Sequence, residues 1–126
     1  MRRAVGAILL ALLASPPARA EIPAREAFQL HCSGCHGPDG HGAAEFVPDL
    51  HELAPLVAAP GGREYLVRVP GVAQAPVESE ALARLLNFVL TEMSGVDDLD
   101  AFDAAEVEAL RRRPFLDPVG ARPVPR

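Results

Sequence analysis

The fold is decided by one short stretch, His31-Cys32-Ser33-Gly34-Cys35-His36-Gly37. Two residues separate its two cysteines, and a histidine follows the second cysteine directly. At this spacing both thiols can add to the vinyl groups of one porphyrin from a single turn of chain, and the adjacent imidazole can ligate the iron. The stretch therefore predicts one covalently bound haem c, held by Cys32 and Cys35 with His36 as the proximal iron ligand.

Three other interpretations use part of this stretch. A thioredoxin-like thiol pair would need a βαβ unit, and the chain shows no β-rich α/β pattern. A zinc site would need further ligands; His41 and His51 could be recruited, but there is no second cysteine pair. A structural disulfide between Cys32 and Cys35 would leave His36 without a role, whereas haem attachment uses all three side chains.

The run from Cys32 to Gly42, Cys-x-x-Cys-His-Gly-Pro-Asp-Gly-x-Gly, resembles the haem-binding run of bacterial class I c-type cytochromes. The resemblance extends over roughly residues 24 to 93. It implies a small all-α cytochrome c fold, with helices wrapped around one covalently attached haem, and a function in electron transfer.

Residues 1–20 are typical of a secretory signal peptide. A basic Arg2-Arg3 pair precedes an apolar segment, and Ala18-Arg19-Ala20 forms a small-x-small cleavage site. The apolar segment is too short to span a bilayer, so we expect no stable membrane anchor after cleavage. Because the resembled family acquires its haem outside the cytoplasmic membrane, motif and leader together predict a periplasmic protein.

The charge of the chain indicates the kind of partner that it meets. Its formal charge is −5 at pH 7, and removal of residues 1–20, with three arginines and no acids, moves that charge to −8. An acidic protein is a poor binder of nucleic acid. The charge instead favours a redox protein with a basic docking face.

The rest of the chain divides into a haem domain, residues 21–95, and a C-terminal extension, residues 96–126. In the haem domain, apolar spacing predicts short helices from Pro23 to about Leu30 and from Arg63 to Val69, and the strongest helix from about Ser79 to Met93. The resemblance implies that the first of these helices crosses the last one beside the haem.

The extension has its own helical pattern. Asp103-Ala104-Ala105-Glu106 has capping-box character and predicts a short helix at about 103–113, which Pro114 ends. Arg111, Arg112 and Arg113 would complement the end of its dipole, or form a docking patch for an acidic partner or for the haem propionates. Residues 118–126 are expected to form a mobile tail.

The resemblance also assigns side chains around the haem. Pro48-Asp49-Leu50 resembles the family's Pro-x-Leu element, in which the proline carbonyl accepts a hydrogen bond from the proximal histidine. By this resemblance Pro48 orients His36, and Leu50 packs on the haem ring. Arg63 is a candidate for a haem propionate through its forked guanidinium, or is solvated.

The sixth iron ligand is the main departure from the family pattern. The family usually places a methionine before the last helix, often as Met-Pro, where this chain has Val69-Pro70, and valine cannot bind iron. Met93, the one methionine after the leader, is either a core residue or the distal ligand. His41, His31 and Gln74 are further candidates, and an open or water-bound position is the remaining alternative.

The sixth ligand separates two functions. With two strong axial ligands the protein would be an electron carrier rather than an enzyme, for instance the electron acceptor of a periplasmic dehydrogenase. With an open position it would be a gas-binding sensor or a peroxidase-like enzyme. Peroxide chemistry needs a distal acid-base group, and no histidine is well placed for one, so the sequence favours electron transfer.

Overall fold

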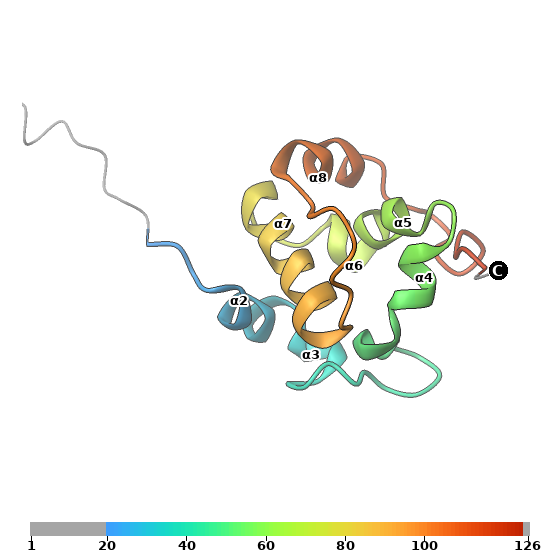
Figure 1. Ribbon diagram of the computed structural model, residues 1–126, viewed down its shortest axis with the longest axis horizontal. Helices are drawn as coiled ribbons and strands as arrows, with labels where there is room; N and C mark the ends of the chain where they lie inside the picture. The colour runs from blue at the N-terminus through green and yellow to red at the C-terminus, as the bar shows by residue number, and fades with distance from the viewer. Residues whose placement is uncertain (1–19, 125–126) are drawn as a thin grey trace, which may run out of the picture.

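The computed structural model describes residues 20–124; residues 1–19, which hold nearly all of the expected signal peptide, and residues 125–126 lie outside the described part. Within residues 20–124 the regular structure is helical, and the one extended contact is an isolated bridge between Ala43 and Val47. Figure 1 shows short helices and loops wrapped around one another. The all-α fold expected from the sequence is confirmed. Each helix in this part of the chain is too short or too polar to span a bilayer.

Two helices far apart in sequence form the centre of the core. Helix α2 (Ala24–His31) packs on α7 (Ser79–Phe88), with Phe28 fully buried between them and Leu82 2% exposed. The rings of Phe28 and Phe88 lie 6.4 Å apart in a tilted arrangement. Burial of a phenylalanine of this kind contributes roughly 2–3 kcal/mol relative to exposure. The contact therefore fixes the start of the haem motif, which follows α2 directly.

The last helix of the haem domain ends in a π-helical turn, η2 (Val89–Met93), rather than continuing as an α-helix. The backbone N–H of Ser94 donates to Val89 O at 3.0 Å, five residues back, and Gly95 then ends the turn with φ +63°. A π turn holds one residue more than an α turn, so Met93 leaves the α-helical register that the sequence assigned to it. The hydroxyl of Ser94 donates to Leu50 O and joins this helix end to the loop after the haem motif.

Three short helices cover the middle of the chain: α4 (Ala54–Ala58), α5 (Gly62–Arg68) and α6 (Pro70–Ala73). A 3₁₀ turn, η1 (Leu50–Glu52), leads into the first of them. A Cβ at Gly62 would lie 1.8 Å from Leu56 O, so only glycine allows α5 to approach α4 this closely. Val67 of α5 is fully buried in the same core.

The C-terminal extension is part of this core. Helix α8 (Ala104–Arg111) packs on α7 and α5, and its Val107 is fully buried. The carboxylate of Asp103 accepts the backbone N–H of Glu106 at 2.8 Å, which is the N-cap that the sequence predicted. Figure 1 shows α8 lying across the ends of α5 and α7. The extension thus completes the domain that the sequence placed at residues 21–95.

Arginine side chains attach the extension to the haem domain. Arg111 donates to three carbonyls at the end of α6 and just after it, at Ala73 (3.0 Å), Ala75 (2.6 Å) and Val77 (2.7 Å). This side chain is therefore not part of the docking patch considered for residues 111–113, whereas Arg112 is exposed and pairs with Glu108. An arginine fork fits such a set of carbonyls because its donors are fixed in one plane.

The chain after α8 also stays against the domain. The hydroxyl of Tyr65 donates to Pro118 O at 2.8 Å, and Arg68 stacks on the ring of Phe115 at 3.9 Å. The tail that was expected to be mobile from residue 118 therefore contacts the domain at its first residue, because a buried tyrosine needs a partner for its hydroxyl and finds it there.

We predict that Arg111→Met destabilises the haem-loaded protein by about 2 kcal/mol, because three carbonyls lose a charged donor at once. Arg112→Met is the matched control, since its side chain is 72% exposed, and it should cost less than about 0.5 kcal/mol. Chemical denaturation followed by circular dichroism measures both. Equal effects of the two substitutions would show that Arg111 does not clamp the segment.

Candidate functional site

The Cys-x-x-Cys-His stretch forms one tight turn after α2. Cys32 ends α2 by donating its backbone N–H to Phe28 O at 2.9 Å, and α3 (Ser33–His36) begins directly after it. The backbone N–H of His36 donates to Cys32 O at 3.0 Å. Both thiols are free; Cys32 is half-buried and Cys35 is exposed. The local helix therefore presents two thiols and an imidazole within a single turn, because residues three and four apart lie on one helical face.

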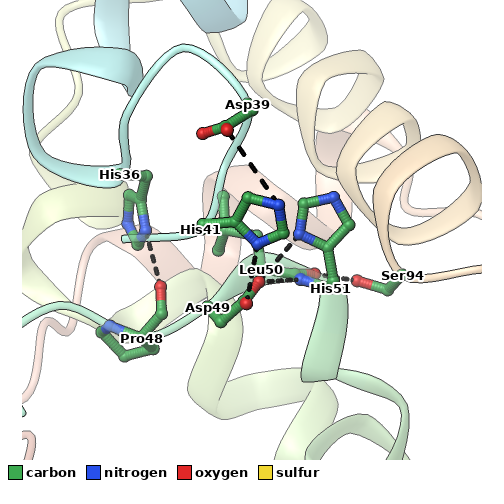
Figure 2. A network of polar contacts seen from close by, with 8 residues as sticks. All are labelled: His36, Asp39, His41, Pro48, Asp49, Leu50, His51 and Ser94. Carbon is green, nitrogen blue, oxygen red and sulfur yellow. Dashed lines mark hydrogen bonds and ion pairs between the residues drawn. The ribbon is translucent and has the colours of Figure 1, made fainter. Parts of the chain in front are cut away.

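The imidazole of His36 is held in one tautomer. Its Nδ1 lies 3.0 Å from Pro48 O (Figure 2). A carbonyl oxygen only accepts, so Nδ1 carries the proton and Nε2 keeps a free lone pair. The structure thus contains the His36–Pro48 contact that the Pro-x-Leu resemblance implied, and the contact makes Nε2 the metal-binding atom.

A glycine lets the loop after His36 bring Pro48 into place. Gly42 has φ +69°, and a Cβ there would lie 2.3 Å from Val47 O and 2.6 Å from Pro48 O. Its own backbone N–H donates to His36 O at 2.7 Å, and the N–H of Leu50 closes the loop on Gly40 O at 2.9 Å. No other residue fits this close approach of two backbone segments.

The thiols do not resemble those of a redox-active dithiol. Burial raises the pKa of the Cys32 thiol above its ordinary value, and the neighbouring Cys35 raises it further, whereas the attacking cysteine of a thioredoxin-like pair has a lowered pKa. Residues 20–124 also contain no βαβ unit. Within residues 20–124 the two thiols also belong to no group of three closely spaced metal ligands, whereas a structural zinc site needs four ligands around one ion.

The family model for cytochrome c matches residues 23–110. The chain belongs to the cytochrome c family. No curated protein sequence matches it significantly. The cytochrome is of class I, binds haem c covalently and is a haem electron-transfer protein.

The donor set fits this cofactor. Two free thiols one turn apart, Cys32 and Cys35, would form the thioether bonds, and the Nε2 lone pair of His36 would ligate the iron. When bound, the haem supplies a reversible one-electron couple. Half-buried apolar side chains, among them Leu50 and Val69, border the core and would pack against an apolar macrocycle.

Arg63 has a different partner from the propionate considered for it. Its guanidinium binds both carboxylate oxygens of Glu106, at 2.6 and 2.7 Å, and donates to the carbonyls of Asp100 (2.6 Å) and Ala101 (3.2 Å). It also lies 3.9 Å above the ring of Phe102. Because its donors bind the C-terminal extension, Arg63 has a structural role, which argues against the propionate contact considered for it.

Met93 packs against the loop that follows the haem motif. A Cβ on Gly40 would lie 3.1 Å from Met93 Sδ and 3.6 Å from His51 Cε1, so the sulfur packs against the loop that carries Pro48. That loop faces Nδ1 of His36, whereas a distal ligand approaches from beyond Nε2. The structure therefore does not support Met93 as the sixth ligand.

The contacts and exposure of the other candidates for the sixth iron ligand also give no sign of that role. His41 binds Asp49 through Nδ1 at 2.9 Å, on the same loop as Pro48. His31 and Gln74 are exposed. Val69, where the family usually has methionine, is half-buried at the start of α6.

Two contributors to the site were absent from the sequence analysis. The close approach at Gly42 became visible only in three dimensions, although three glycines in residues 37–42 are a signal of a constrained loop. Asp49 caps η1 by accepting the backbone N–H of His51 at 2.8 Å. An aspartate whose side chain can accept the backbone N–H two residues later is a recognisable local signal for such a cap.

We predict that Gly42→Ala destabilises the cytochrome by about 3 kcal/mol, because the new Cβ displaces the backbone at Pro48. The substitution should also raise the reduction potential, since an imidazole that loses the acceptor for its Nδ1 proton donates less charge to ferric iron. Denaturation and spectroelectrochemistry measure the two effects.

Gly61→Ala is the matched control for this substitution. Gly61 has φ +78° but no atom within 4 Å of an added Cβ, so alanine there should cost only the strain of a left-handed backbone, about 1 kcal/mol. The reduction potential should stay unchanged. An unchanged potential in Gly42→Ala as well would contradict the role assigned to the His36–Pro48 bond.

Proposed function

We propose that this cytochrome is a mono-haem electron carrier of the bacterial periplasm that accepts electrons from a periplasmic dehydrogenase. The observation that carries the proposal is the His36 imidazole, fixed by Pro48 beside two free thiols with Nε2 available. The single Cys-x-x-Cys-His motif supports one haem, and the signal-peptide pattern of residues 1–20 supports export.

The charge of the protein supports a basic partner. The loop after the haem motif and the short turns η1 and η2 carry exposed acidic side chains, including Asp39, Glu45, Glu52 and Glu92. Together with the charge of −8 expected after removal of three arginines with residues 1–20, they would attract a cationic docking face and speed the encounter. Such attraction is strongest at low ionic strength.

This proposal predicts opposite salt effects with two small redox reagents. Between 10 and 150 mM ionic strength, reduction of the ferric protein by cationic hexaammineruthenium(II) should slow by roughly tenfold, because the screening length falls from about 30 to about 8 Å. Electron exchange with anionic ferrocyanide should become faster. Stopped-flow absorbance measures both rates, and equal salt dependence with the two reagents would rule out an acidic docking face.

A second candidate function is binding of a small ligand at an open distal site. Val69 stands where the family usually has methionine, and the sulfur of Met93 packs beside Gly40. Neither residue is thereby identified as a strong sixth ligand of the iron. A haem whose iron has a free sixth coordination position binds diatomic gases.

We predict that Met93→Leu leaves the absorption spectrum of the haem-loaded protein unchanged, because the sulfur packs on the proximal loop. Loss of a sulfur-to-iron charge-transfer band in this variant would instead identify Met93 as the ligand. The same samples, reduced and mixed with carbon monoxide, separate the two functions. A rapid spectral shift supports the small-ligand site, and an unchanged spectrum supports a carrier with two protein ligands.

A further inference from the structure

A second group of metal-binding side chains lies outside the haem motif, on the loop that carries Pro48. The carboxylate of Asp49 bridges two imidazoles, with Oδ2 2.9 Å from His41 Nδ1 and Oδ1 2.8 Å from His51 Nδ1. The two rings stack with their centroids 4.3 Å apart. Figure 2 shows the two rings side by side, with a nitrogen of each turned toward the carboxylate of Asp49.

The backbone holds this group in place. Asp49 Oδ1 also accepts the backbone N–H of His51 at 2.8 Å, which caps η1. The backbone of Leu50, between these two residues, donates to Gly40 O at 2.9 Å and accepts from the hydroxyl of Ser94. These hydrogen bonds hold the three side chains close together before any ligand binds. Binding would therefore cost little conformational entropy for ordering them.

The distances suit a metal ion. One ligand atom from each of the three residues lies within 4.8 Å of the others. Two ligands about 2.0–2.1 Å from one ion, at angles between square-planar and tetrahedral, lie about 2.9–3.3 Å apart. The nitrogen–oxygen distances of 2.8 and 2.9 Å, each to a different oxygen of Asp49, are close to this range. The two rings, which now stack at an interplanar angle of 24°, would turn so that both Nδ1 lone pairs face one ion.

The charge and exposure of the group also suit a cation. Hydrogen bonds with His41 and with the backbone and side chain of His51 hold the pKa of Asp49 well below its usual range, so its carboxylate is ionised. A second carboxylate, Asp39, lies 4.0 Å from His41 Nε2. His41 is 62% exposed, which leaves room for water on the open side of an ion.

We propose that His41, Asp49 and His51 form a surface site for a divalent transition-metal cation, separate from the haem iron. Two imidazole nitrogens and one carboxylate are a common donor set for Zn²⁺, and imidazole also suits Cu²⁺. Water completes the coordination on the exposed side.

Titration of the haem-loaded, chelator-treated protein with Zn²⁺ tests this site by calorimetry. The pH is 8, because the bond to Asp49 raises the pKa of His41 and a proton there competes with the metal. The expected result is one Zn²⁺ per protein. His51→Ala and Asp49→Asn should each weaken binding by at least about tenfold. Asparagine caps helical turns as well as aspartate does, so Asp49→Asn removes the charge while keeping the turn.

His31→Ala is the matched control, since His31 is an exposed histidine on α2. It should leave the Zn²⁺ affinity unchanged. With Cu²⁺, electron paramagnetic resonance should show two imidazole nitrogens in the parent protein and one in His51→Ala. If Zn²⁺ does not bind stoichiometrically, the three side chains form hydrogen bonds alone and the proposed site is wrong. If His31→Ala weakens binding as much as His51→Ala does, surface histidines bind the metal nonspecifically and the proposed site is also wrong.

Discussion

The hydrogen bond from His36 Nδ1 to the carbonyl of Pro48 is the contact on which the rest of the site depends. It selects the tautomer of the imidazole, and with it the nitrogen that is free for iron. The bond requires a loop that leaves His36 and returns within twelve residues, which is possible because Gly42 lets two backbone segments almost touch. The nitrogen of His36 that is free for iron therefore depends on a glycine that acts through the backbone contact it permits.

The C-terminal extension supports the opposite end of the same domain. Without a cofactor, a chain of this size has few large side chains with which to form a core. Helix α8 adds Val107 and the segment before it adds Phe102, and arginines bind backbone carbonyls that would otherwise need water. The bidentate pair of Arg63 and Glu106 joins α5 to α8 in the same way. Arg63 and Arg111 thus connect separate segments of this cytochrome, whereas Arg112 forms a surface ion pair.

The sequence predicted those features that depend on neighbours along the chain. The haem ligands, the amphipathic spacing of α2 and α7 and the cap at Asp103 are all local patterns, and the structure contains the predicted helices and cap. The partner of Arg63 lies 43 residues away and could not be read from spacing. Helices α4 and α6, each of four or five residues, have too few positions to show a period. The π turn at Val89–Met93 depends on tertiary contacts, including that of Ser94 with Leu50.

Three consecutive residues each serve a different neighbour: Pro48 binds the proximal histidine, Asp49 binds two further imidazoles, and the backbone of Leu50 is bonded to both Gly40 and Ser94. Insertion or deletion of one residue within this segment would disrupt the contacts of all three residues at once. Between Ala43 and Val47, by contrast, the chain forms an exposed turn closed by its own bridge. During the divergence of related sequences, length changes in this loop should therefore collect in residues 43–47 and avoid residues 48–51.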